Sequence, residues 1–168
     1  MNGADRADLP KSPPDFRILR GKTNEFMRIY EATEPSDLLA EAFARLLPQL
    51  SERMTAPDRE AVARIVASPA TRQLVAAAED GRIVGLLSVA RYAVPSGRKA
   101  WSEDVVVEAA TRGRGIGEAL VREALALARR EGVARVMLTS NATRRAAHRL
   151  YERMGFVRYE TDCFRLDL

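Results

Sequence analysis

The residues of this sequence best suited to chemistry form a short glycine-rich stretch in the second half of the chain. In order, they are Arg112, Gly113, Arg114, Gly115, Ile116 and Gly117. Glycine has no Cβ, so the backbone can approach a ligand closely there. A strand-like apolar run precedes the stretch and a helical pattern follows it, so the free N–H groups of a helix N-terminus meet the loop. Because the two guanidinium groups also match phosphate oxygens, the stretch favours a phosphate-binding loop.

Two other known phosphate-binding motifs require a residue spacing that this loop does not have. A dinucleotide-binding fingerprint needs Gly-x-Gly-x-x-Gly, whereas the spacing here is Gly-x-Gly-x-Gly and Arg114 would crowd the crossing point. A P-loop ends in Gly-Lys-Ser/Thr, whereas Gly117 is followed by Glu118. A plain glycine-softened turn without a ligand stays open as a further alternative.

The remaining pattern, Arg-x-x-Gly-x-Gly after a strand, resembles the pyrophosphate-binding motif of the GNAT superfamily of coenzyme A-dependent N-acyltransferases. The resemblance runs from about Arg72 to the C-terminus. It includes Glu103–Val107 before the loop and Ala147–Phe156 after it. The resemblance implies acetyl-CoA as cosubstrate and no metal. It also implies a mixed α/β fold in which two central strands splay apart to admit the cosubstrate.

Acyl transfer from a thioester to an amine requires carbonyl polarisation, removal of a proton from the ammonium group and protonation of the departing thiolate. In the fold that the resemblance implies, the backbone groups of Val105 and Val107 bind the cosubstrate. The N–H of Val105 would point at the thioester oxygen and that of Val107 at the pantetheine arm. The loop residues Arg112 to Gly117 would bind the pyrophosphate. The two valines are also expected to be ordinary buried strand residues by their side chains.

Glu103 and Asp104 precede this run and form the candidate acidic pair. A carboxylate at the end of a buried strand can have a raised pKa and can accept a proton through water. Acetyltransferases of glucosamine phosphate and of polyamines are similar in carrying an acidic pair here. By that analogy Glu103 is expected to be the base and Asp104 to orient the substrate or the loop. An exposed strand-end pair is the alternative.

Tyr151 is the candidate general acid. In the resembled family, the tyrosine of the last helix faces the cosubstrate sulfur, where its hydroxyl protonates the thiolate. Tyr151 also lies on the apolar face of its expected helix, so a core tyrosine is the alternative. A half-buried phenol needs a hydrogen-bond partner under either interpretation.

Two polar residues near the end of the expected parallel strand complete the candidate cosubstrate site. Asn141 ends that strand, where its amide is expected to hold the pantetheine, although a turn-forming asparagine is an alternative. Arg144 and Arg145 open the last helix, a position unfavourable for the helix dipole, which suggests an anionic partner, although a solvated basic face is the alternative for both. Arg144 is therefore included among the cosubstrate-binding candidates.

The hydrophobic periodicity predicts the elements that position these residues. We expect strands at 26–33, 71–78, 83–92, 100–107, 135–139, 156–160 and 163–168. We expect a first helix that begins within 34–37 and ends at 50, a second at 57–67 with Thr55 as a possible N-cap, a third at 118–130 and a fourth at 143–154. The last two strands should close the sheet as an antiparallel pair. The predicted fold is a central mixed, mostly antiparallel sheet of about six or seven strands. It has one parallel pair splayed at the cosubstrate site and about four helices on both faces.

Composition limits the class of protein further. Residues 111–168 hold 12 arginines against 7 acidic residues, so the positive charge gathers around the glycine loop. A polyphosphorylated cosubstrate explains this charge more simply than nucleic acid, because no zinc spacing or RNA-binding motif accompanies it. No apolar run reaches the ~20 residues of a membrane span. A single cysteine, Cys163, fits a cytoplasmic protein. Residues 1–15 are polar and proline-rich, which predicts a disordered leader before one GNAT-like domain at 16–168.

The sequence therefore predicts an acetyl-CoA-dependent N-acetyltransferase that acts on a small primary amine by direct attack in a ternary complex. Acetylation of a protein N-terminus or lysine is an alternative, and a non-catalytic acyl-CoA sensor is a second one. Tyr92 and Trp101 are expected to wall the acceptor site. Neither nucleic acid nor a membrane is expected as a partner, and a homodimer is possible. The sequence does not identify the acceptor amine.

Overall fold

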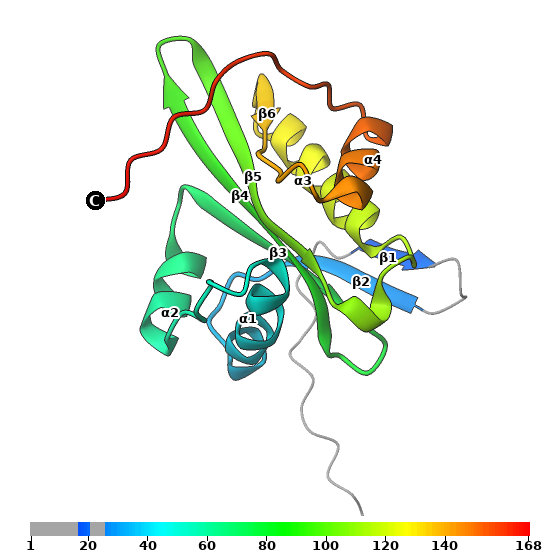
Figure 1. The fold of residues 1–168 in the computed structure, drawn as a ribbon. Coiled ribbons are helices and arrows are strands. Elements are labelled where there is room, and N and C mark those ends of the chain that lie inside the picture. The colour runs from blue at the N-terminus through cyan, green and yellow to red at the C-terminus, as the bar shows by residue number, and fades with distance from the viewer. Residues whose placement is uncertain (1–16, 21–25) are drawn as a thin grey trace, which may run out of the picture.

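The computed structural model describes residues 17–20 and 26–168, which form one six-stranded sheet with helices on both faces (Figure 1). The strands follow one another across the sheet in chain order: β1 (Arg17–Arg20), β2 (Phe26–Glu31), β3 (Thr71–Ala77), β4 (Ile83–Val94), β5 (Gly97–Val107) and β6 (Arg135–Met137). All neighbouring strands are antiparallel except β5 and β6, which are parallel. The predicted mixed sheet with one parallel pair is therefore confirmed.

In the described part of the chain, four α-helices and one short 3-10 turn accompany the sheet. They are α1 (Asp37–Leu50), α2 (Arg59–Ala67), η1 (Ala109–Thr111), α3 (Ile116–Arg130) and α4 (Arg145–Arg153). Figure 1 shows α1 and α2 together on one side of the sheet, with α3 and α4 on the other. No helix of the described residues has the length and apolar character needed to cross a membrane.

Local sequence signals explain where the first two helices begin. The Ser36 hydroxyl accepts the N–H of Leu39 at 3.2 Å and caps α1. Asp58 caps α2 by accepting the N–H of Ala61 at 2.7 Å, so the expectation that Thr55 is the cap is wrong. Asp58 is preferred because it directly precedes the apolar periodicity of α2.

Two hydrophobic clusters hold these helices against the sheet. On one side, side chains of α1 and α2 pack on strand residues that include Leu86 and Val106. On the other side, α3 buries Leu120 and Ala124 against strand residues that include Leu87 and Ala100. Burial on both faces makes β4 and β5 the centre of the fold.

The C-terminal segment differs from the sequence-based expectation. Residues 156–168 contain no strand, so the predicted closing antiparallel pair is wrong. Its alternating apolar side chains are exposed instead, including Val157 (85%) and Phe164 (92%). A period-2 pattern produces a strand only where a neighbouring edge pairs with it. The short β1 was not predicted, and the expected leader at 1–15 lies outside the described residues.

Candidate active site

The strand that leads into the glycine loop contains a β-bulge at Asp104. Glu103 lies opposite Ser88 and Val106 lies opposite Leu86, so β5 has one more residue than β4 in this interval. Asp104 has φ 51°, and it is the one non-glycine residue with positive φ in the part of the chain that is described. Aspartate tolerates this left-handed conformation better than most residues. A bulge changes the direction of its strand, and this one lies directly before Val105 and Val107, whose backbone groups are predicted to bind the cosubstrate.

β5 and β6 stop pairing well before the loop begins. Their parallel ladder covers Lys99–Trp101 of β5 and Arg135–Met137 of β6. Among residues 17–20 and 26–168, no strand pairs with β5 on that side beyond Trp101. The second half of β5 therefore has β4 on one side only, as the predicted splay requires.

The backbone groups of Val105 and Val107 point to this unpaired side. The carbonyl of Val105 accepts a hydrogen bond from Arg144 Nη2 at 3.2 Å, and the carbonyl of Val107 accepts one from Arg112 Nε at 3.0 Å. Since the N–H and C=O of one strand residue point the same way, their N–H groups face this side too. The valine side chains pack against the core on the α3 side. Both expectations for these residues, backbone groups at the splay and packed side chains, agree with this geometry.

The glycine loop owes its glycines to backbone conformation at two positions and to close packing at a third. Gly113 and Gly115 have φ 80° and 87°, and a Cβ at either would meet no atom within 4 Å. A Cβ on Gly117 would lie 3.2 Å from Leu150 Cδ2, so this glycine brings α3 close to α4. The side chain of Ile116 is buried in the core, which limits its part in an anion site to the backbone N–H.

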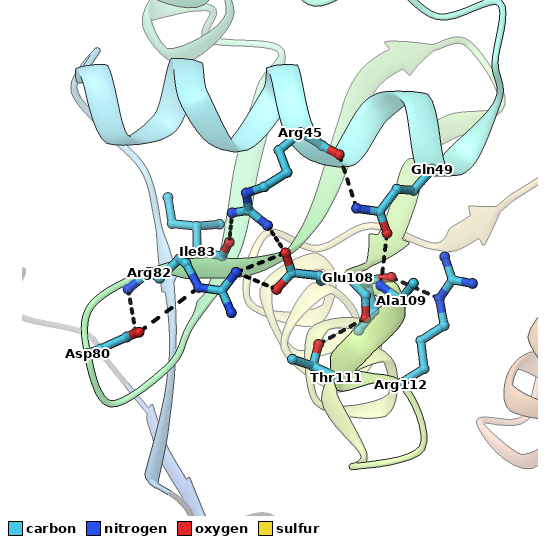
Figure 2. Close-up of polar contacts among 10 residues, drawn as sticks. Arg45, Gln49, Asp80, Arg82, Ile83, Glu108, Ala109, Thr111 and Arg112 are labelled. Atoms are coloured by element: carbon cyan, nitrogen blue, oxygen red, sulfur yellow. Dashed lines mark hydrogen bonds and ion pairs between the residues drawn. The ribbon is translucent and has the colours of Figure 1, made fainter.

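Side chains of α1 contact the start of the loop (Figure 2). The Glu108 carboxylate is bound by Arg45 of α1 and by Arg82, whose Nη1 is 2.9 Å from it. Gln49 Oε1, also on α1, accepts the N–H of Ala109 at 2.8 Å. Sequence reasoning missed this cluster, because a single acidic residue after a strand gives no signal of its distant arginine partners.

Tyr151 is buried, with 6% of its surface exposed, and its ring contacts Phe156 edge-on at a centroid distance of 5.8 Å. Burial raises the pKa of the phenol, and the positive charge of Arg144 opposes this shift. Arg144 also donates to Val105, so it links α4 to the unpaired half of β5. Tyr151 is thus a core residue close enough to Arg144 to feel its charge, and its role as general acid stays a prediction.

The two candidate carboxylates have perturbed acidities. Burial and the neighbouring charge of Asp104 raise the pKa of Glu103, and burial raises the pKa of Asp104. Both shifts favour proton acceptance closer to neutral pH. The described residues contain no group of three or more His, Cys, Asp or Glu placed to hold a metal ion.

Asn141 has a structural role that restricts its part in binding. Its Oδ1 accepts the N–H of Thr143 at 2.9 Å and the Thr143 hydroxyl at 2.8 Å. These bonds form the turn that leads into α4. The turn interpretation of Asn141 therefore fits the structure, and its amide –NH₂ is the group left for a cosubstrate contact.

Trp101 and Tyr92 form a pair on the face that α1 and α2 cover. Trp101 Nε1 donates to the Tyr92 hydroxyl at 3.2 Å. Ala100 belongs to the α3-side core, so alternation along β5 places Trp101 and Glu103 on the opposite face. The expected aromatic wall and the candidate base consequently share one face, across β5 from α3.

Two buried hydroxyls at the splay were not identified from the sequence. The Oγ atoms of Ser102 and Ser140 are buried and have no hydrogen-bond partner among the described residues. Ser102 directly follows the last β5 residue that pairs with β6, and Ser140 lies three residues beyond the last paired residue of β6. Buried hydroxyls without partners are costly, so their presence on both sides of the separation fits a site built for a polar ligand.

Comparison with known proteins places this arrangement in a family. The model of the acetyltransferase (GNAT) family matches residues 25–156. A probable glucosamine 6-phosphate N-acetyltransferase of Oryza sativa subsp. japonica is 35% identical over 141 residues, which cover 78% of this chain and 81% of that protein. The mycothiol acetyltransferase of Renibacterium salmoninarum is 33% identical over 91 residues, 53% of this chain. The match spans only 27% of that longer protein.

A solved structure extends the likeness to the whole fold. An acetyltransferase of Trypanosoma brucei superposes with a TM-score of 0.69 at 28% identity, covering 84% of this chain and 99% of that one. The family match includes the bulged strand, the glycine loop and the tyrosine helix within residues 25–156. The chain belongs to the GNAT family of acetyltransferases.

Proposed function

We propose that this protein transfers an acetyl group from acetyl-CoA to a primary amine of a small molecule, by direct attack in a ternary complex. The observation that carries the proposal is the unpaired half of β5, which leads directly into a glycine loop and a helix N-terminus. The amine nitrogen forms a bond to the acetyl carbon as the carbon–sulfur bond breaks. The GNAT family in general uses acetyl-CoA, and this site supplies groups that fit its parts.

Backbone groups carry most of the proposed cosubstrate binding. The N–H of Val105 would bind the thioester oxygen and stabilise the charge that develops on it, while Val107 would bind the pantetheine arm. The loop from Arg112 to Gly117 would bind the pyrophosphate through N–H groups and guanidinium donors. Arg144 already lies beside Val105 and would add a positive charge at the same edge.

Two side chains would move the protons. Glu103, with a raised pKa, would accept a proton from the acceptor ammonium, directly or through water. A tyrosine phenol is protonated at neutral pH and burial raises the pKa of Tyr151 further, so this side chain holds a proton that it would donate to the departing thiolate. Asp104 would orient the substrate or the bulge.

The acceptor is proposed to be a small molecule. Trp101, Tyr92 and Glu103 form an aromatic and acidic surface on the α1–α2 face, which suits an ammonium group on a compact body. The rice relative is named for a sugar-phosphate amine, which supports a small acceptor. Acetylation of a protein amine and a non-catalytic acyl-CoA sensor are the alternatives, and the cytoplasmic location stays a prediction.

A screen of acceptors tests this function. Purified protein with acetyl-CoA is assayed for thiol release against amino sugars, polyamines, amino acids and lysine-bearing or N-terminal peptides. We expect one small-amine class to exceed every peptide in kcat/KM. A higher kcat/KM for a peptide would favour the protein alternative. Acetyl-CoA binding without turnover of any amine would favour the sensor.

A further inference from the structure

The cluster around Glu108 has the form of a clamp on the start of the glycine loop. Glu108 is 7% exposed, and two arginines from different elements bind its carboxylate (Figure 2). Arg45 comes from α1 and also donates to the carbonyl of Ile83 at 2.6 Å. Arg82 comes from the turn before β4 and places its Nη1 2.9 Å from the carboxylate. The clamp therefore joins β5, α1 and the β3–β4 turn at one carboxylate.

The residues that follow Glu108 are tied down as well. Gln49 accepts the N–H of Ala109 at 2.8 Å and donates its own amide to the carbonyl of Arg45 at 3.1 Å. The Thr111 hydroxyl donates to the carbonyl of Glu108 at 3.0 Å. Together with the bond from Arg112 to Val107, these contacts fix the backbone from 107 to 112 immediately before the first positive-φ glycine.

A loop with two glycines in the left-handed region binds a ligand more readily when contacts with the rest of the protein already hold its backbone in place. Glycine has more backbone freedom than any other residue, so ordering the loop around an anion costs conformational entropy. The helix α3 fixes the loop at its far end. A clamp at the start of the loop lowers the conformational-entropy cost that remains when the loop orders around the ligand. Acetyl-CoA would then bind more tightly without any new contact.

We propose that Glu108 is a positioning residue for the cosubstrate loop: its ion pairs with Arg45 and Arg82 hold the loop in the conformation that binds the pyrophosphate of acetyl-CoA. This inference rests on the proposed function, since it needs acetyl-CoA as the ligand. Glu108 acts through the backbone and does not itself touch the cosubstrate.

An electrostatic role and a positioning role of Glu108 predict opposite changes in acetyl-CoA affinity for the substitution Glu108→Gln. Glu108→Gln removes a negative charge near the loop and, among the described residues, leaves Arg45 without an acidic partner and Arg82 with Asp80 at 4.0 Å, so charge alone predicts tighter binding of the anionic cosubstrate. Loss of the clamp predicts weaker binding. The direction of the change in affinity therefore separates the two effects.

A matched control is available at the far end of α3. Glu131 is likewise bound by two arginines, Arg72 at 3.4 Å and Arg91, and its side chain is 21% exposed. Glu131→Gln breaks a comparable cluster that contributes nothing to the loop. Both variants should lose some stability, because each leaves partly buried arginine charge without its carboxylate partner. Only Glu108→Gln should alter the cosubstrate affinity.

The experiment measures acetyl-CoA binding by calorimetry and steady-state kinetics for the full chain and its variants. For Glu108→Gln we expect the Kd and the KM for acetyl-CoA to rise about tenfold, with kcat at saturation nearly unchanged, because the loss is one of uniform binding. Glu131→Gln should keep the wild-type Kd. Arg82→Ala, at a half-exposed site, removes one arm of the clamp and should raise the Kd by a smaller factor, which keeps the test available if Glu108→Gln does not fold.

The outcomes separate the inference from the function on which it rests. Absence of acetyl-CoA binding by the wild-type chain would overturn the proposed function. Wild-type binding with an unchanged or lower Kd in Glu108→Gln would overturn the positioning role alone. An equal loss of affinity in Glu131→Gln would show that general destabilisation, and no clamp, is responsible.

Discussion

Tyr151 is a core residue that we also propose as the general acid, and the removal of one oxygen atom separates these two roles. Tyr151→Phe keeps the ring, its burial and its contact with Phe156, but it removes the proton that would go to the thiolate. We expect kcat to fall by about 100-fold, the range for loss of a general acid, while the melting temperature changes little. Steady-state thiol-release assays measure the change in kcat, and thermal unfolding measures the change in melting temperature. Full activity in the variant would leave Tyr151 as a core residue only.

The raised pKa of Glu103 leads to a prediction about how the reaction rate depends on pH. Because burial and Asp104 raise its pKa, the carboxylate becomes protonated at a higher pH than an ordinary glutamate, and the proposed base is lost below that pKa. Glu103→Gln removes this base, so the rate should then depend on the fraction of acceptor amine that is already neutral.

The measurement is kcat/KM as a function of pH for the wild type and for Glu103→Gln. We expect the variant to lose activity most at neutral pH and to have its optimum at higher pH. Two profiles of the same shape and position would exclude Glu103 as the base and would turn attention to Asp104, whose pKa burial also raises.

At the scale of elements, α3 offers a comparison between its two ends. Gly115 at its start has φ 87° and Gly132 just after its end has φ 68°, and a Cβ at either position meets no atom within 4 Å. Alanine at either site therefore costs about 1–2 kcal/mol of backbone strain. We expect Gly115→Ala and Gly132→Ala to lower the melting temperature similarly.

Acetyl-CoA binding should distinguish these two variants. Only Gly115→Ala redirects the loop that meets the proposed pyrophosphate, so its Kd should rise about tenfold while that of Gly132→Ala stays near the wild-type value. Calorimetry with acetyl-CoA measures both. Equal affinities in the two variants would remove the loop from the binding site.

The elements around the loop follow closely from local sequence signals. Apolar periodicity and the glycines of residues 113–117 predicted β5, α3 and their connection, because these features are contiguous in the chain. The parallel placement of β6 followed from its separation from β5 by a helix. Local patterns of this kind predict secondary structure well where the hydrophobic period, the element length and the flanking glycine or turn residues agree.

Features set by contacts between distant segments were not predictable in the same way. The bulge at Asp104 exists because β4 and β5 pair out of step by one residue, and no local pattern indicates that offset. The partners of Glu108 lie 63 and 26 residues away in sequence. The roles of Glu103, Tyr151 and the loop stay predictions, because geometry and acidity support them without testing them.

The whole molecule exposes an apolar C-terminal segment, residues 157–168. Its large apolar side chains are 68% exposed or more: Val157, Tyr159, Phe164, Leu166 and Leu168. Exposed apolar groups of this size mark interaction sites, so we expect the segment to supply the contact if the protein forms the homodimer that the sequence left open. A chain ending at Phe156 should keep its fold and bind acetyl-CoA, because the removed residues form no strand.

Sedimentation velocity over a range of concentrations tests this role of the segment. We expect the full chain to self-associate and the shortened chain to stay monomeric. Phe164→Ser with Leu166→Ser should have the same effect as the truncation if apolar burial drives association. A full chain that stays monomeric throughout would contradict this role of the segment.

The unpaired half of β5 has a consequence for solubility. A strand that lacks a partner on one side offers its backbone groups to other chains, which is how edge-to-edge aggregation begins. Here the guanidinium groups of Arg144 and Arg112 occupy the carbonyls of Val105 and Val107. Their charges would also repel an approaching edge of like charge. Arg144→Ala should therefore scatter more light than the wild type on heating, and acetyl-CoA should reduce that scattering. The arginines proposed to bind the cosubstrate would then also keep the open strand from templating aggregates.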